Sequence, residues 1–391
     1  MSRLADLINE LCPDGVEYKN IGSFADCVAG ATPKTTDPTF WDGDIPWMSS
    51  GEVNKGTVYS TDRFITKAGY DSCSTKIVPP GAVVIALAGQ GKTRGTVART
   101  RIELCTNQSL CSILTQECVN SDFLYHFLAG EYDNLRAVSS GDGTRGGLNL
   151  KMIRAYKVPV PPLEVQREIV KILDQFTTLE AELEAELEAR RTQYEYYRNQ
   201  LLSYDALASR GPVKWVKLKD IVSMRAGSSI TSKDIATVAD SSHVYPCYGA
   251  NGIRGYVSAV TNRDNASIIG RQGALSGNIS FAEAPFFATE HAVVVTPKVK
   301  LVLRWLYHTL IVAELSKYVT KSAQPGLSVR RLEQVEVLFP SIKEQQRIAD
   351  ILDRFDALVN DISSGLPAEI AARRAQYEYY RDRLLSFPEK K

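Results

Sequence analysis

The sequence predicts an α/β protein (of the α+β kind) made of two similar mixed regions, each followed by one long helix. The hexapeptide QYEYYR occurs twice, at 193–198 and again at 376–381. The segment VQREIVKILDQF at 165–176 likewise returns as EQQRIADILDRF at 344–355. A repeat of roughly 180 residues is far longer than a solenoid repeat of about 20–50 residues. It therefore indicates an internal, pseudo-two-fold duplication of a whole domain together with its helix.

Length and composition are those of a globular protein with two or three domains. The chain has 391 residues, of which 44% are hydrophobic and 23% are charged. No apolar run approaches the roughly 18–20 residues of a membrane span, and the N-terminus lacks the apolar core of a secretory signal. The seven cysteines form no C-x-x-C pair and have no histidine at zinc-like spacing. We therefore expect reduced thiols in a cytoplasmic protein, and no bound metal.

The net charge of +1 is unevenly distributed along the chain. Residues 212–339 contain 15 Lys and Arg against 9 Asp and Glu, a net charge of +6, whereas 161–203 contains 5 against 9, a net of −4. A protein that held nucleic-acid phosphates unaided would be more basic. If DNA is the ligand, we expect a partner subunit to supply part of the positive field.

The first long helix is predicted at 161–203. Its apolar residues recur in steps of three, four and seven, which is the seam of a coiled coil with one stutter. The second helix, predicted at 340–391, repeats this seam. Because matching apolar stripes must be buried and a whole region separates the two helices, we expect them to form an antiparallel coiled coil. The expected helix-pairing residues are Ile169, Ile172, Phe176, Leu179, Leu183 and Leu187 in the first helix and Ile348, Ile351, Phe355, Leu358 and Ile362 in the second.

The segment LEAELEAELEA at 179–189 repeats a four-residue unit. Four helical residues add about 6 Å of length and about 40° beyond a full turn, and one DNA base pair adds about 3.4 Å and about 35°. A helix that grows in fours therefore changes the separation of its ends by one or two base-pair steps. A generic Glu-rich, solvated helix is the alternative interpretation. In the second helix, Gly365 and Pro367 predict a break, with a new helix opening at Pro367.

The regions before the two helices are predicted to be mixed α/β domains. Apolar runs at 82–87 and 291–296 predict buried strands. Periodic segments at 123–135 and 303–319 predict helices. On these helices His126 and His308 are expected to be packed rather than catalytic.

The tyrosines of the two QYEYYR segments are spaced as in a helix. This spacing favours packing over base stacking. We expect these tyrosines to hold the far end of each helix against a globular domain.

Two glycine-rich loops are candidates for ligand binding. ALAGQGKTRG at 86–95 contains Gly91-Lys92-Thr93, but a P-loop requires glycine where Ala86 stands, and GRQGALSG at 270–277 has no such triplet. A nucleotide-binding enzyme is therefore an alternative only. Glycine lets a loop approach a surface, and Gln, Lys and Arg side chains bind base edges or phosphates; ordinary strand-connecting turns are the competing interpretation. The expected DNA-binding residues, including two in polar loops before the last strands, are Gln90, Lys92, Arg94, Arg145, Arg271, Gln272 and Lys321.

No arrangement of residues suggests catalysis. No nucleophile is paired with a base, and neither G-x-S-x-G nor H-E-x-x-H occurs. We therefore expect a binding protein without catalytic residues and without a cofactor of its own. A coiled-coil scaffold with no preference for DNA sequence is a further alternative.

The duplicated regions, the I-L-D-x-F helices ending in QYEYYR and the opening LCPDGVEYKNIG resemble the specificity (S) subunit of type I restriction–modification systems. The resemblance implies target recognition domains at 1–160 and 204–339, each reading one half of a bipartite DNA site. It implies spacer helices at 161–203 and 340–391 that also dock two methyltransferase (M) subunits, which hold S-adenosylmethionine. Restriction (R) subunits, which use ATP and Mg²⁺, would complete an ATP-dependent endonuclease.

Overall fold

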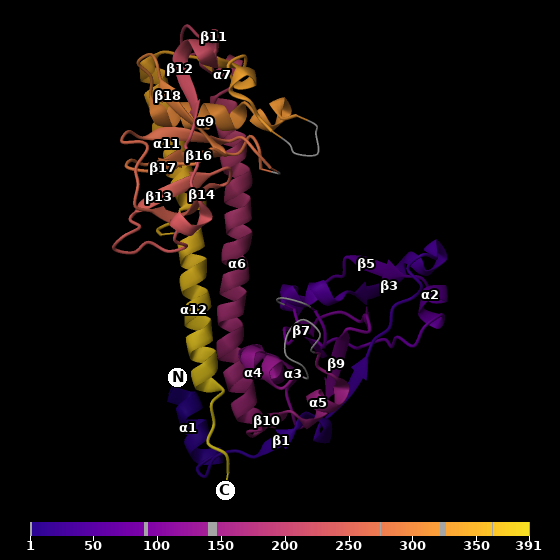
Figure 1. Cartoon of the computed structure of the whole chain (residues 1–391). Helices are drawn as coiled ribbons and strands as arrows, with labels where there is room; N and C mark the ends of the chain where they lie inside the picture. The colour runs from indigo at the N-terminus through magenta and orange to yellow at the C-terminus, as the bar shows by residue number, and fades with distance from the viewer. Residues whose placement is uncertain are drawn as a thin grey trace. The chain divides into compact units, whose positions relative to one another are not determined.

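The computed structural model describes residues 2–89, 93–139, 147–273, 275–320, 326–361 and 363–390. It divides into two compact units (Figure 1). Unit 1 comprises Met1–Glu182 with Ile370–Lys391, and unit 2 comprises Leu183–Glu369. Each unit therefore combines one α/β domain with parts of two long helices.

The centre of unit 1 is a five-stranded sheet with the strand order β2-β9-β6-β7-β4. All four residues of the central strand β6 are buried, as the apolar run at 82–87 predicts. A smaller sheet has the order β5-β3-β8, and β1 pairs with β10. The strands are β1 (Tyr18–Asn20), β2 (Ala25–Ala29), β3 (Trp41–Met48), β4 (Thr57–Val58), β5 (Arg63–Ile65), β6 (Val83–Ala86), β7 (Val97–Thr100), β8 (Cys105–Thr106), β9 (Leu110–Thr115) and β10 (Lys157–Pro159).

The helices of unit 1 are shorter than the sequence predicts. The single helix expected at 123–135 is wrong, because α3 ends at Gly130 and α4 begins at Tyr132. Between them Glu131 leaves helical geometry, with φ −91° and ψ 15°, and its carboxylate accepts a hydrogen bond from the hydroxyl of Tyr156. The helices and 3₁₀ turns are α1 (Ser2–Leu11), η1 (Ile21–Ser23), η2 (Pro38–Phe40), η3 (Ser50–Lys55), α2 (Lys67–Asp71), α3 (Ser121–Gly130), α4 (Tyr132–Ala137) and α5 (Leu150–Ala155).

Unit 2 repeats the strand arrangement of unit 1, except that its main sheet, among the described residues, has four strands and lacks a counterpart of β4. Its main sheet has the order β12-β18-β15-β16, the smaller sheet has the order β14-β13-β17, and β11 pairs with β19. The apolar run at 291–296 forms the largely buried β18. The strands are β11 (Lys214–Lys217), β12 (Val222–Ala226), β13 (Tyr245–Gly249), β14 (Gly252–Val257), β15 (Ala266–Gly270), β16 (Ile279–Ala282), β17 (Phe287–Ala288), β18 (Ala292–Pro297) and β19 (Glu336–Phe339).

The helix expected at 303–319 is also interrupted. Helix α9 ends at Val312, because Glu314 adopts the left-handed conformation with φ 46°, which an α-helix does not accommodate. A 3₁₀ turn, η5, follows it. The helical segments of the unit 2 domain are α7 (Tyr204–Ala208), α8 (Leu218–Ile221), η4 (Ser232–Asp234), α9 (Leu303–Val312), η5 (Leu315–Tyr318) and α10 (Val329–Leu332).

Three long helices complete the two units: α6 (Leu163–Leu201), α11 (Ile342–Asn360) and α12 (Leu366–Leu384). The expected break in the second helical region is confirmed, since α11 ends at Asn360 and α12 has Pro367 in its first turn. A Cβ atom on Gly365 would lie 2.5 Å from the carbonyl oxygen of Ala357. The tight connection between the two helices therefore requires glycine at this position.

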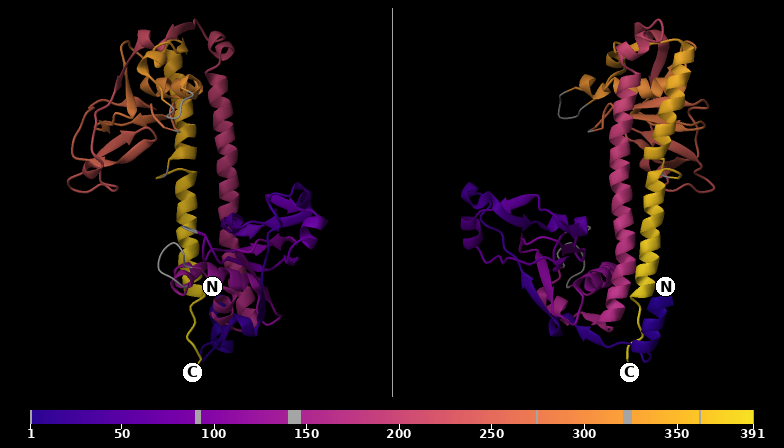
Figure 2. Two further views of the ribbon diagram at one scale, coloured as in Figure 1. Left: turned by 45° about the vertical axis from the view of Figure 1, so that its right-hand side comes forward. Right: turned by 180° about the vertical axis from the view of Figure 1, so that it is seen from behind.

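The long helices contact one another inside each unit (Figure 2). In unit 1 the ring of Phe176 on α6 stacks on Tyr380 of α12 at 5.3 Å. Glu180 of α6 also pairs with Arg374 of α12. In unit 2 the ring of Tyr197 on α6 lies 5.8 Å from that of Phe355 on α11. Aromatic contacts thus join α6 to a different helix in each unit.

The two chain ends pack together in unit 1. The side chain of Leu4 on α1 shares one buried cluster with Leu385 and Phe387, which follow α12. The hydroxyl of Tyr18 donates a hydrogen bond to the carbonyl of Phe387 over 2.9 Å. Unit 1 therefore depends on residues from both ends of the sequence.

Hydropathy offers no sign of membrane insertion in the part of the chain that the structure describes. No helix there combines the length and the apolar character that a membrane crossing requires.

Candidate nucleic-acid interface

The two glycine-rich loops of the sequence occupy the same place in the two units. One connects β6 to β7 and the other connects β15 to β16. The loop in unit 1 closes with a hydrogen bond from Gly95 N to Ala86 O of 2.9 Å, and the loop in unit 2 closes from Gly277 N to Gly270 O over 2.8 Å. Gly95 and Gly277 both have positive φ, of 84° and 93°, a conformation that glycine adopts without strain.

Three of the seven expected DNA-binding residues belong to the described residues, and all three lie in these loops. Arg94 is half-buried, and its carbonyl accepts a hydrogen bond from Arg136 over 3.5 Å. Arg271 is half-buried and Gln272 is exposed, directly after β15. The other four, Gln90, Lys92, Arg145 and Lys321, lie outside the described residues.

The side chain of Gln272 meets a residue that the sequence analysis did not select. Its Oε1 atom lies 2.5 Å from Nδ1 of His291, which precedes β18. The other ring nitrogen of His291 lies 3.5 Å from a carboxylate oxygen of Glu290. No spacing in the sequence reveals this contact, because Gln272 and His291 are brought together by the pairing of β15 with β18.

A groove on unit 2 gathers cationic side chains. It has a volume of about 670 Å³ and is lined by Lys317, Tyr318, Ser328, Arg330, Arg331 and Gln334. Arg331 donates a hydrogen bond to the carbonyl of Tyr318 over 3.0 Å, which fixes its guanidinium at the groove. Cationic side chains held in this way suit a polyanion.

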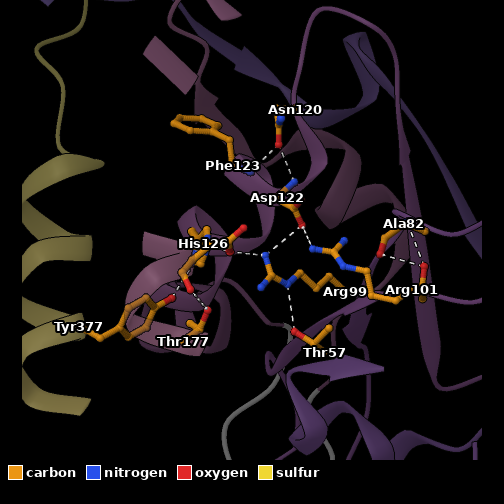
Figure 3. A network of polar contacts seen from close by, with 12 residues as sticks. Thr57, Ala82, Arg99, Arg101, Asn120, Asp122, Phe123, His126, Thr177 and Tyr377 are labelled. Atoms are coloured by element: carbon orange, nitrogen blue, oxygen red, sulfur yellow. Dashed lines mark hydrogen bonds and ion pairs between the residues drawn. The ribbon is translucent and has the colours of Figure 1, made fainter. Parts of the chain in front are cut away.

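A polar cluster joins the α/β domain of unit 1 to both of its long helices (Figure 3). Asp174 of α6 accepts hydrogen bonds from Nε2 of His126 on α3, over 3.0 Å, and from Arg99 on β7, over 2.6 Å. The other ring nitrogen of His126 lies 2.9 Å from the hydroxyl of Tyr377 on α12. Arg99 also donates to Asp122 over 3.0 Å. The His126 side chain is fully buried and bridges α6 and α12.

The partners of His126 determine where its proton lies. Burial lowers the pKa of His126, so the imidazole is neutral at pH 7. An ionised carboxylate only accepts hydrogen bonds, so Nε2 carries the hydrogen and Nδ1 accepts from the hydroxyl of Tyr377. Burial alone would raise the pKa of Asp174, but hydrogen bonds from His126 and Arg99 lower it to about 2.

Unit 2 contains a matching cluster of aspartate, histidine, tyrosine and arginine, in which the arginine comes from a different secondary-structure element. Asp353 of α11 accepts from Nε2 of His308 on α9 and from Arg304, each over 2.8 Å. The Nδ1 atom of His308 lies 3.1 Å from the hydroxyl of Tyr194 on α6. The arginine comes from the helix α9 here, whereas in unit 1 it comes from the strand β7. An arginine thus pairs with the matching aspartate in each unit.

These clusters confirm that the histidines are packed and that QYEYYR tyrosines hold helices against globular domains. The arginines and aspartates were missed. The two aspartates were nevertheless visible in the sequence, because each is the Asp of a repeated I-L-D-x-F segment.

The expected helix-pairing residues differ in their burial. Ile169 and Ile348 are fully buried and Leu183 is 8% exposed. Leu358 is 39% exposed, whereas the adjacent Val359 is fully buried. Ile172, Phe176, Leu179, Leu187, Ile351 and Phe355 are half-buried, and Ile362 lies outside the described residues.

Two leucines of the long helices, Leu173 and Leu352, are fully buried although they lie outside the expected seam. Leu173 shares a buried cluster with Phe123 of α3. Leu352 shares one with Trp305 of α9. The helices therefore bury a wider stripe than a two-helix seam requires, because each also packs on an α/β domain.

Comparison with known proteins places the chain in one family. The family model described as "Type I restriction modification DNA specificity domain" matches residues 13–189 and 212–372. The type I restriction enzyme EcoprrI specificity subunit of Escherichia coli is 35% identical over 387 residues, covering 93% of each chain. The EcoR124I/EcoR124II specificity subunit of the same species is 35% identical over 263 residues, covering 59% of this chain and 63% of the relative.

Solved structures show the same fold. The crystal structure of the type I restriction–modification S subunit from M. genitalium has a TM-score of 0.61 at 16% identity, covering 95% of this chain and 96% of that one. A chain from a structure that addresses complex assembly of the type I system has a TM-score of 0.55 at 18% identity, with 95% and 98% covered. This chain therefore belongs to the type I restriction modification DNA specificity domain family and is the DNA specificity subunit of such a system.

Proposed function

We propose that this subunit reads a bipartite DNA site, one half with each α/β domain, at 1–160 and 204–339. The main support is a comparison of the β6–β7 loop with the β15–β16 loop. The two loops share a closing backbone hydrogen bond and a positive-φ glycine but differ in their side chains. Two copies of one scaffold with different side chains suit two half-sites of different sequence. The subunit itself is non-catalytic, so a nucleotide-binding enzyme is not proposed. It is a DNA specificity subunit, so a scaffold without sequence preference is not proposed either.

The helices at 161–203 and 340–391 hold the two readers at a fixed spacing as an antiparallel coiled coil. Two contacts in unit 1 support this arrangement: Phe176 with Tyr380, and Glu180 with Arg374. From the first contact to the second, the residue number rises along α6 and falls along α12, which is the order expected of antiparallel helices. The helix-pairing residues proposed are those of the sequence analysis, whereas Leu173 and Leu352 pack the same helices on the α/β domains.

The DNA contacts are assigned to the two hairpin loops and to the groove of unit 2. Arg94, Arg271 and Gln272 carry donors that suit base edges or phosphates, and Gln90, Lys92, Arg145 and Lys321 stay predictions from the sequence. Arg330 and Arg331 in the groove add phosphate contacts. Phosphate contacts fix the register of the protein on the duplex, and base contacts specify the sequence.

The partners proposed are two methyltransferase subunits that hold S-adenosylmethionine, and restriction subunits that use ATP and Mg²⁺, in the cytoplasm. A net charge of only +1 supports this proposal, because a protein that held the phosphates of a long site unaided would carry a larger net positive charge.

Methylome sequencing tests the proposal. Cells that express this subunit with its methyltransferase partner should carry methylated adenine at a motif of two specified blocks separated by an unspecified spacer. Cells with the partner alone are the control and should lack that motif. A contiguous motif would contradict the proposal, and so would methylation without sequence preference.

A further inference from the structure

We propose that Arg271 and Gln272 read the acceptor edge of one guanine-containing base pair or two adjacent ones, with His291 as the positioning residue for Gln272. This inference rests on the proposed function and names the reading residues of one half-site. It places His291 in the interface, which neither the sequence nor the family comparison assigns.

The backbone around these residues repeats that of unit 1. Arg271 N donates to His291 O over 3.0 Å, and Leu327 N donates to Arg271 O over 2.8 Å. In unit 1 the bonds from Leu87 N to Ser109 O, of 2.8 Å, and from Leu148 N to Leu87 O, of 2.9 Å, have the same pattern. The matching bonds make Leu87 the counterpart of Arg271 and Ser109 the counterpart of His291. Ala88 follows Leu87 as Gln272 follows Arg271, in a loop that is two residues longer in unit 1 (Ala86 to Gly95) than in unit 2 (Gly270 to Gly277).

The side chains at these matched positions differ in kind. Unit 1 has leucine, alanine and serine where unit 2 has arginine, glutamine and histidine. Since the same hydrogen bonds form around Leu87 and Ser109, the backbone does not require arginine and histidine at the matched positions of unit 2. Their presence therefore points to a ligand rather than to the architecture of the domain.

Arg271 has a hydrogen-bond donor, unsatisfied within the described residues, that a ligand could satisfy. Its Nε atom is buried and has no hydrogen-bond partner among the described residues. A buried donor without a partner destabilises the folded state, and an acceptor on a bound ligand would remove that loss. An arginine has five N–H donors and no acceptor, which fits the N7 and O6 acceptors of guanine.

His291 fixes the orientation of the Gln272 amide. Its Nδ1 lies 2.5 Å from Oε1 of Gln272, and its Nε2 lies 3.5 Å from Oε1 of Glu290. The carbonyl oxygen of the Gln272 amide is an acceptor, so Nδ1 of His291 carries the hydrogen in this contact. With its oxygen engaged by His291, the exposed Gln272 presents its NH₂ group outward. Together with Arg271 it forms a set of donors.

The chain is open beside this set. Gly273 has φ 84°, and a Cβ atom added there would meet no atom of the described residues within 4 Å. A base edge can therefore approach the backbone next to Gln272 without a clash. A phosphate oxygen is also an acceptor, but a phosphate needs no fixed amide orientation, so the contact with His291 favours base reading.

The test uses the intact subunit with its methyltransferase partner and the residues of unit 1 as replacements. The triple variant Arg271→Leu, Gln272→Ala and His291→Ser should fold, because unit 1 carries these residues on the same backbone. The single variants Gln272→Ala and His291→Ser are made in parallel. The purified complexes bind duplexes in which every base pair of the two half-sites is replaced in turn.

We expect the triple variant to lose discrimination at one or two adjacent positions of one half-site by roughly 5- to 100-fold, the range of one good bidentate contact. The other half-site and the spacer should not change. His291→Ser should weaken discrimination at the same position as Gln272→Ala, and by less.

Three results would overturn the inference. One is discrimination that is unchanged at every position. Another is uniform weakening for all sequences with a shallower salt dependence, which identifies a phosphate contact instead. The last is loss of binding to every duplex by His291→Ser with an unchanged thermal unfolding midpoint. A contiguous wild-type motif, by contrast, would refute the proposed function.

Discussion

The Nδ1 atom of His308 lies 3.1 Å from the hydroxyl oxygen of Tyr194, and this contact joins the α/β domain of unit 2 to α6, the helix that follows the first α/β domain in the sequence. The matching contact in unit 1 joins His126 of the first α/β domain to Tyr377 of α12, which follows the second α/β domain in the sequence. Each α/β domain is thus bound to its own following helix through an aspartate and to the other helix through a tyrosine. In each repeat, the tyrosine that contacts the buried histidine comes from the long helix of the other repeat.

Tyr194→Phe should lower the stability of unit 2. The substitution removes the hydroxyl that donates to the buried His308 and leaves a ring nitrogen without its partner, which costs about 1–3 kcal/mol. The thermal unfolding midpoint of the purified subunit measures this loss. Tyr196→Phe is the matched control, because Tyr196 is 60% exposed in the same QYEYYR segment. Equal midpoints for the two variants would disprove the role of the Tyr194 hydroxyl.

Unit 1 should lose stability as the pH falls. Burial lowers the pKa of His126 from its ordinary 6.5, so the unfolded chain takes up a proton more readily and the stabilising contribution declines as pH drops below about 6.5. Asp174 has a pKa lowered to about 2 from 3.8, so its contribution is present above about pH 4 and is lost between about pH 4 and 2.

His126→Gln and Asp174→Asn separate the two effects of pH. Glutamine retains one donor and one acceptor but does not titrate, so His126→Gln should flatten the dependence of the unfolding midpoint between pH 7 and 5. Asp174→Asn should flatten it only below about pH 4. Profiles parallel to that of the unsubstituted protein would show that these groups do not govern its acid sensitivity.

Leu352→Ala should destabilise unit 2 by about 2–5 kcal/mol, because Leu352 is fully buried and alanine leaves a cavity. Leu358→Ala, on the same helix α11, should change stability by no more than about 0.5 kcal/mol, because Leu358 is 39% exposed. Denaturant unfolding of the two variants measures both values. A larger loss for Leu358→Ala than for Leu352→Ala would mean that the sequence seam, and not the observed burial, describes the packing.

Periodic and local signals made some features of this fold predictable. The buried strands β6 and β18 follow from their apolar runs. The break between α11 and α12 follows from Gly365 and Pro367, whose backbone restrictions do not depend on distant residues.

Features that depend on distant residues could not be predicted. Helix α3 ends where Glu131 meets the hydroxyl of Tyr156, which is 25 residues away in the chain. Val359 is buried in place of Leu358, in a cluster that the long helices share with the α/β domain and that a two-helix seam does not predict. The contact of Gln272 with His291 likewise arises only once β15 and β18 are paired.

The spacing of the two half-sites tests whether the long helices set the distance between the two DNA-reading domains. One Leu-Glu-Ala-Glu unit is inserted after Glu182 in α6, and the methylated motif is determined by methylome sequencing of cells with the methyltransferase partner. We expect a spacer longer by one or two base pairs, with both half-sites unchanged. An unchanged spacer, or new half-sites, would contradict this expectation.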